Sequence, residues 1–127
     1  MNASTQQLVR LVKAQAGESF RSAFCYDSDD WTALYVRSDI ATDQLKAVVP
    51  TLAERARRHE PLVREQDYPG MGTHRASVAI HDEAVMIHFQ VEEQSGIVVT
   101  LDTGVARNLS EFVAACERVL SPPQRRQ

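Results

Sequence analysis

The sequence predicts an α+β domain in which a five-stranded antiparallel sheet carries helices on its two faces. Three observations support this fold class. The chain has 127 residues, a length typical of one domain with one hydrophobic core. Hydrophobic residues make up 43% of it and charged residues 24%, as in folded globular domains. Segments with helical and β periodicity follow one another in the order helix, strand, strand, helix, strand, strand, strand, helix.

A helix and a hairpin open the chain. Leucine and valine residues recur at helical spacing behind a serine–threonine pair that can cap a helix, and Gly17 can end this helix. β-Prone residues then run from Phe20 to Tyr26 and from Trp31 to Arg37, and the polar segment between them contains Asp27, Asp29 and Asp30. This pattern predicts a hairpin. The aspartates could hold a hard cation, but because a calcium loop needs a turn glycine and a distal glutamate, we interpret them as turn residues.

The middle helix is predicted to start after Thr42, a residue type that caps helix N-termini. Apolar residues then recur at three- and four-residue spacing, namely Leu45, Val48, Val49, Leu52, Ala53 and Ala56. Pro50 interrupts this stripe. Because a proline in a helix interior removes a backbone hydrogen bond, we expect the helix to kink at Pro50 or to begin near it.

Three strands and a helix complete the predicted fold. The strand-like segments 75–81, 84–91 and 96–101 are separated by short polar connections, which predicts an antiparallel meander. Ser110 can cap a last helix whose apolar face would contain Phe112, Val113, Cys116, Val119 and Leu120. Two prolines end that helix. The domain is therefore expected to span 1–121, with a C-terminal tail at 122–127.

The order of elements resembles that of the roadblock dynein-light-chain domains and their profilin-like relatives. This resemblance covers nearly the whole chain but includes no diagnostic motif. It implies a non-enzymatic homodimer that regulates or scaffolds other proteins and pairs through its middle helix or a sheet edge. A shared fold does not establish a shared function, so this remains an expectation by analogy.

A second resemblance lies in the segment Asp29 to Ile40, which reads DDWTALYVRSDI. It is similar to a family of small uncharacterised haloarchaeal proteins that share an Asp-Asp-aromatic turn followed by a Tyr-hydrophobic-Arg strand. No activity is attached to that family. The resemblance therefore implies no catalytic residues.

The histidines and cysteines are the residues best suited to chemistry. His74, His81 and His88 repeat every seven residues, but they lack a metal-ligand spacing, and we interpret them as structural or surface histidines. Cys25 and Cys116 lie in apolar patterns outside any CxxC motif, which favours packing roles and a reducing, cytoplasmic location. No catalytic residue, metal or cofactor is predicted, and no apolar run is long enough to span a membrane.

Three hypotheses for function remain open. The first is a non-catalytic regulatory or interaction module that acts as a homodimer, with an unidentified protein partner. The second is a small-ligand or metal sensor that uses the sheet face bearing Met86, His88 and Gln90, joined by Tyr35 and Arg37 if the second strand lies close by. The third is weak nucleic-acid binding through the basic patch from Arg55 to Arg64, which the net charge of −3 disfavours. The candidate interaction or ligand surface comprises Arg55, Arg57, Arg58, Arg64, Tyr35, Arg37 and His88.

Overall fold

The structure is a computed structural model that describes residues 3–63 and 66–108. It contains two helices and five strands, namely α1 (Ala3–Ala16), β1 (Phe20–Tyr26), β2 (Trp31–Val36), α2 (Asp43–Arg58), β3 (Ser77–Ile80), β4 (Ala84–Glu92) and β5 (Ser95–Asp102). The predicted α+β class is therefore confirmed. The predicted last helix, the tail at 122–127 and Arg64 lie outside the described residues.

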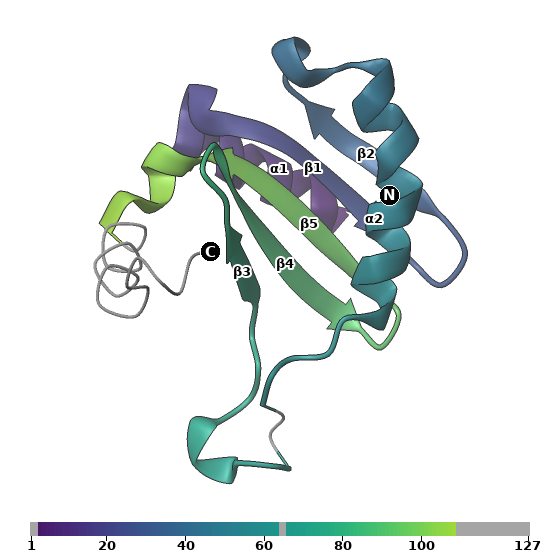
Figure 1. The fold of residues 1–127 in the computed structure, drawn as a ribbon, viewed down its shortest axis with the longest axis vertical. Helices are drawn as coiled ribbons and strands as arrows, with labels where there is room; N and C mark the ends of the chain where they lie inside the picture. Colours follow the sequence, from purple (N-terminus) through teal and green to yellow (C-terminus); the bar gives the residue numbers. More distant parts are fainter. Residues whose placement is uncertain (1–2, 64–65, 109–127) are drawn as a thin grey trace, which may run out of the picture.

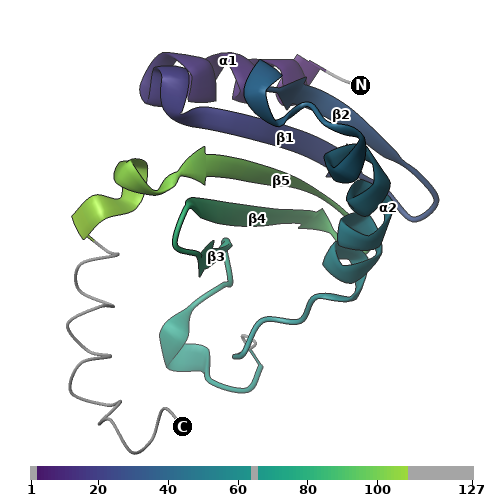
Figure 2. The same ribbon diagram turned by 45° about the horizontal axis from the view of Figure 1, so that its top comes forward.

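The five strands form one antiparallel sheet in the order β2-β1-β5-β4-β3. The predicted hairpin and meander are both present, and β5 joins them by pairing with β1. Figure 1 shows α2 in front of the sheet and α1 behind it, and Figure 2 shows the same layers from another side. Each helix therefore covers its own face of the sheet.

The face under α1 is a packed apolar core. Phe20 is completely buried there, and Ala23, Ile97, Val99 and Leu101 surround it. The strand pairing of β1 with β5 shifts between Phe20 and Ser22. Because such an irregularity changes which residues share a face, Phe20 joins Ala23 in this core rather than Phe24 on the other side.

The other face of the sheet is covered by α2, which is stabilised both by a local N-terminal cap and by packing against the sheet. The Thr42 hydroxyl accepts a hydrogen bond from the Leu45 backbone N–H at 3.2 Å, as predicted for the N-terminal cap. Val49, Ala53 and Ala56 are buried against the sheet. The expectation that the helix begins near Pro50 is wrong, because α2 already starts at Asp43 and includes Pro50. Its buried stripe packs on both sides of the proline, and this packing outweighs the local preference.

A clamp fixes the C-terminal end of α2 to the β1–β2 turn. Asp27 accepts backbone hydrogen bonds from Asp29 at 2.9 Å and Asp30 at 2.8 Å, so the predicted aspartate turn is confirmed. These two bonds lower the pKa of the Asp27 carboxyl. Arg57 donates from α2 to the backbone carbonyls of Asp27 and Asp30. The end of the helix is thereby held at a fixed position over the sheet.

Candidate functional site

The predicted surface residues lie in separate parts of the fold. Because β1 and β5 stand between β2 and β4, Tyr35 and His88 do not share a site. Tyr35 stacks on Phe20 with ring centroids 4.4 Å apart, on the face under α1. Tyr35 and Arg37 were expected to join His88 only if the second strand lay close by, and this condition is not met. The strand order, which depends on long-range pairing, separates them.

Arg37 has a structural role at the end of the sheet. Its guanidinium donates to Asp39 at 2.6 Å and to Asp102 at 2.8 Å, and also to the Glu18 carbonyl at 2.7 Å. The Arg37 partner lowers the pKa of both carboxyl groups. These bonds join the end of β2 to β5 and to the turn after α1. The donors of Arg37 are thus occupied within the fold.

The three arginines at the end of α2 differ in their hydrogen-bond and ion-pair partners. Arg57 bonds to Glu54 at 3.1 Å in addition to its clamp on the β1–β2 turn, and Arg58 bonds to Glu54 at 2.8 Å. Arg55 has no hydrogen-bond or ion-pair partner among the described residues, and it lines a cavity between α2 and the sheet. Of these three arginines, Arg55 is the one with its donors available to a ligand.

Two of the predicted histidines come together, and a fourth histidine joins them. His59 caps the C-terminus of α2, His74 lies just before β3, and His88 lies in β4. The ring of His59 contacts both of the others, with centroids 5.1 Å from His88 and 6.5 Å from His74. His81 lies exposed at the β3–β4 turn instead. The seven-residue repeat therefore does not define the cluster.

Ser77 at the start of β3 links two of these imidazoles. Its hydroxyl oxygen lies 3.0 Å from Nε2 of His59 and 2.9 Å from Nε2 of His74. A hydroxyl has a single proton, so Ser77 donates to one ring and accepts from the other. One neutral imidazole therefore carries its proton on Nε2 and the other carries a bare Nε2. The arrangement holds a donor and an acceptor side by side.

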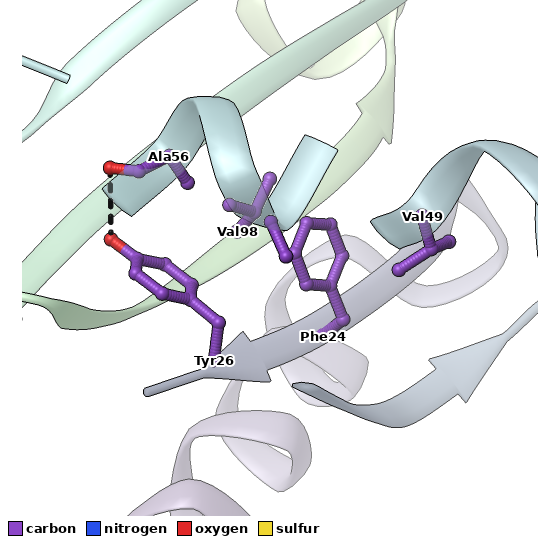
Figure 3. Packing of buried hydrophobic residues seen from close by; sticks show 6 residues of the cluster. Phe24, Tyr26, Val49, Ala56 and Val98 are labelled. Carbon is purple, nitrogen blue, oxygen red and sulfur yellow. Dashed lines mark hydrogen bonds between the residues drawn. The ribbon is translucent and has the colours of Figure 1, made fainter. Parts of the chain in front are cut away.

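Tyr26 anchors the third imidazole from the central strand β1. Its hydroxyl lies 2.6 Å from Nε2 of His88. The hydroxyl also donates to the Ala56 carbonyl at 3.4 Å, the bond drawn in Figure 3. Gly96 provides the space, since a Cβ atom there would stand 2.6 Å from the Tyr26 hydroxyl. Burial raises the pKa of Tyr26, and the charge of Arg57 opposes this rise.

His88 is held in its neutral form. Burial lowers the pKa of its imidazole, and the positive charges of His59 and His74, when protonated, lower it further. His88 therefore binds a proton less readily in the folded chain than in the unfolded chain. His88 supports folding above the ordinary pKa of histidine, and this support is lost as the pH falls toward its own, lowered pKa.

These residues border a cavity of about 310 Å³ between the end of α2 and strands β3 and β4, which we call the histidine cavity. Its polar groups are Arg55, His59, Ser77 and His88. The rest of its lining is apolar, namely Phe24, Leu52, Ala56, Val78, Ala79, Met86 and Val98. Figure 3 shows Phe24, Ala56 and Val98 near the phenol of Tyr26. An apolar cavity with a few polar groups at one place is the usual form of a small-molecule site.

A larger hollow of about 500 Å³ lies under the N-terminal half of α2. It shares Phe24, Leu52 and Met86 with the histidine cavity. Its charged residues, Arg21 and Asp39, are already engaged in ion pairs with Asp102 and Arg37. We therefore consider the histidine cavity to be the better candidate site, because its Arg55 has no partner within the described ranges.

The sequence pointed to part of this site. Met86 and His88 do share the face under α2, as the alternation in β4 predicted, and Met86 packs against that core. His59 and Ser77 were not singled out as site residues. The available signal for His59 was its place directly after the arginines that end α2. No local signal marked Ser77, because His59, one of its two partners, comes from the end of α2.

Chemistry at the remaining candidates is limited. Cys25 is a free, half-buried thiol that packs against the core under α1. Within the described residues no three histidine, cysteine, aspartate or glutamate side chains are arranged to hold a metal ion. The polar groups of the histidine cavity are instead suited to hydrogen bonding and to the exchange of protons.

In the part of the chain that the structure describes, no helix combines the length and apolar character needed to cross a bilayer.

Comparison with known proteins identifies the family. None of the curated proteins matches the sequence. A family model does match residues 6–121, which is most of the chain. This protein therefore belongs to the family described as Domain of unknown function (DUF7522).

Proposed function

We propose that this domain is a non-catalytic regulatory module that binds a small organic molecule in the histidine cavity. The observation that carries the proposal is the convergence of His59, Ser77 and His88 on one end of an otherwise apolar cavity. The polar end orients a ligand and the apolar walls remove its body from water. A volume of about 310 Å³ is near the lower end of the range for small-molecule sites, which indicates a small ligand.

A ligand screen with a blocked cavity tests this proposal. The full chain is heated with members of a panel of small organic acids, alcohols, amines and nucleotides, and the melting temperature is recorded. A ligand present at 100 times its Kd should stabilise the folded state by about 2.7 kcal/mol. Ala79→Trp places a large side chain at the wall of the cavity and should abolish the shift.

Ala33→Trp is the matched control for the screen. Ala33 is also an exposed alanine on an outermost strand, but it does not line the histidine cavity. It should leave the ligand-induced shift unchanged. The proposal is wrong if no compound shifts the melting temperature, or if Ala79→Trp responds to the ligand as the wild type does.

We also propose that the domain forms a roadblock-like homodimer through a sheet edge. Among the described residues, β2 and β3 each pair with one neighbouring strand, and Val78 in β3 is 48% exposed. An unpaired edge with exposed apolar side chains favours pairing with a second strand. Light scattering after size-exclusion chromatography should give a mass of twice 14.2 kDa, and this mass should persist on dilution. A mass of 14.2 kDa at every concentration would contradict the dimer.

The setting of the protein is the last part of the proposal. The similarity of the Asp29–Ile40 segment supports a haloarchaeal origin. The free thiol of Cys25 supports a reducing, cytoplasmic location. In such a compartment the domain would respond to a metabolite rather than to an extracellular signal.

A further inference from the structure

We propose that the ligand of the histidine cavity is a small monocarboxylate with an apolar body, whose carboxylate binds Arg55 and the His59–Ser77 pair. This inference rests on the proposed function and names its ligand class. It follows from the charge of the cavity lining, from Arg55, whose donors have no partner in the described part of the chain, and from the apolar character of the remaining walls.

The charged and titratable groups around the cavity favour an anion. From α2 come Arg55 and His59, from the segment before β3 comes His74, from β4 comes His88, and from β1 comes Tyr26. Each of these groups is neutral or positive near neutral pH. Among the residues that the structure describes, no acidic side chain lines the cavity. A cationic ligand would therefore find no opposite charge among these groups.

Arg55 is the donor best placed for the carboxylate. Arg57 and Arg58 share Glu54, whereas Arg55 has no partner among the described residues. Arg55 in the last turn of α2 and His59 at its C-cap both line the cavity, so a ligand there can reach both. A guanidinium can bind a carboxylate through two parallel hydrogen bonds, which a lysine could not do.

The histidine–serine pair adds a second contact that depends on protons. When the two imidazoles are neutral, His59, Ser77 and His74 share their hydrogen-bonding protons. A protonated imidazole offers a further donor, and the negative charge of a bound carboxylate stabilises that form. Binding should therefore become tighter as the pH falls through the range in which histidines titrate.

The apolar walls set the other half of the ligand. Phe24, Leu52 and Val98 line the cavity away from the polar groups, together with Met86. Methionine adapts to ligands of irregular shape. A short alkyl chain or a single ring fits a cavity of this size and chemistry.

The test compares three probes of equal length, namely hexanoate, hexanol and hexylamine. Each is titrated into the full chain by NMR at about pH 6 and about pH 8, on either side of the usual histidine pKa. Hexanoate should bind about tenfold more tightly than hexanol at the lower pH, because it gains charge-assisted hydrogen bonds. The preference should shrink at the higher pH.

Two matched variants assign the effect to Arg55. R55Q should remove most of the preference for hexanoate over hexanol, whereas R58Q, a neighbouring arginine paired with Glu54, should retain it. The inference is overturned if hexanol or hexylamine binds as tightly as hexanoate, or if R55Q behaves like the wild type. In those cases the proposed function still holds if some probe binds the wild type and Ala79→Trp abolishes that binding. If no probe and no member of the wider panel binds, the proposed function fails as well.

Discussion

Phe20→Ala should lower the free energy of unfolding by about 3–5 kcal/mol, the usual loss when a fully buried phenylalanine is truncated. Phe20 is completely buried under α1 and stacks on Tyr35, so its removal leaves a void with a rigid lining. Urea unfolding followed by circular dichroism measures the loss. The slope of the transition with urea should stay constant, because the surface exposed on unfolding hardly changes.

An exposed leucine in α1, the helix that covers Phe20, provides the control for Phe20→Ala. Leu11 in α1 is 55% exposed, and Leu11→Ala should change the stability by no more than about 0.5 kcal/mol. The folded fraction of Phe20→Ala should still bind the ligand of the histidine cavity, which lies on the opposite face of the sheet. A loss below about 1 kcal/mol would mean that the core under α1 is not packed as described.

Elements with local signals were predicted well. Gly17 ends α1 with a positive φ of 57°, a conformation that glycine adopts without strain. The Thr42 cap and the aspartate turn likewise depend on residues close together in sequence. Pro50 shows where local reasoning fails, because the helix begins at Asp43 and not near the proline. The burial of Val49 and Ala53 on each side is a tertiary effect that no local rule contains.

The candidate site was harder to predict because its parts are distant in sequence. The alternation within β4 placed His88 and Met86 on one face, since side chains in a strand have a period of two. The regular spacing suggested His81, yet the chain returns from α2 to the sheet so that His59 meets His88. The strand order that separates Tyr35 from this site is likewise set by β5 pairing with β1, far along the chain.

Gly96→Ala should lower the free energy of unfolding by about 1–3 kcal/mol or more. This is the loss that overpacking of a core usually causes. A Cβ atom at Gly96 would lie 2.4 Å from the backbone carbonyl oxygen of Phe89 in the neighbouring strand β4. That oxygen cannot rotate away as a side chain could, so β4 and β5 must move apart. The same Cβ would lie 2.6 Å from the hydroxyl of Tyr26. Thermal and urea unfolding of the purified variant measure the effect.

Gly104→Ala separates this clash from the general effect of removing a glycine. No atom lies within 4 Å of a Cβ built at Gly104, so the substitution should be neutral or slightly stabilising through the unfolded chain. In Gly96→Ala the displaced Tyr26 should also release His88, and the NMR signals of that imidazole should shift even where the variant remains folded. If Gly96→Ala is as stable as Gly104→Ala and leaves those signals unchanged, Tyr26 does not occupy the space beside Gly96. The anchor of His88, and with it one wall of the histidine cavity, would then be placed wrongly.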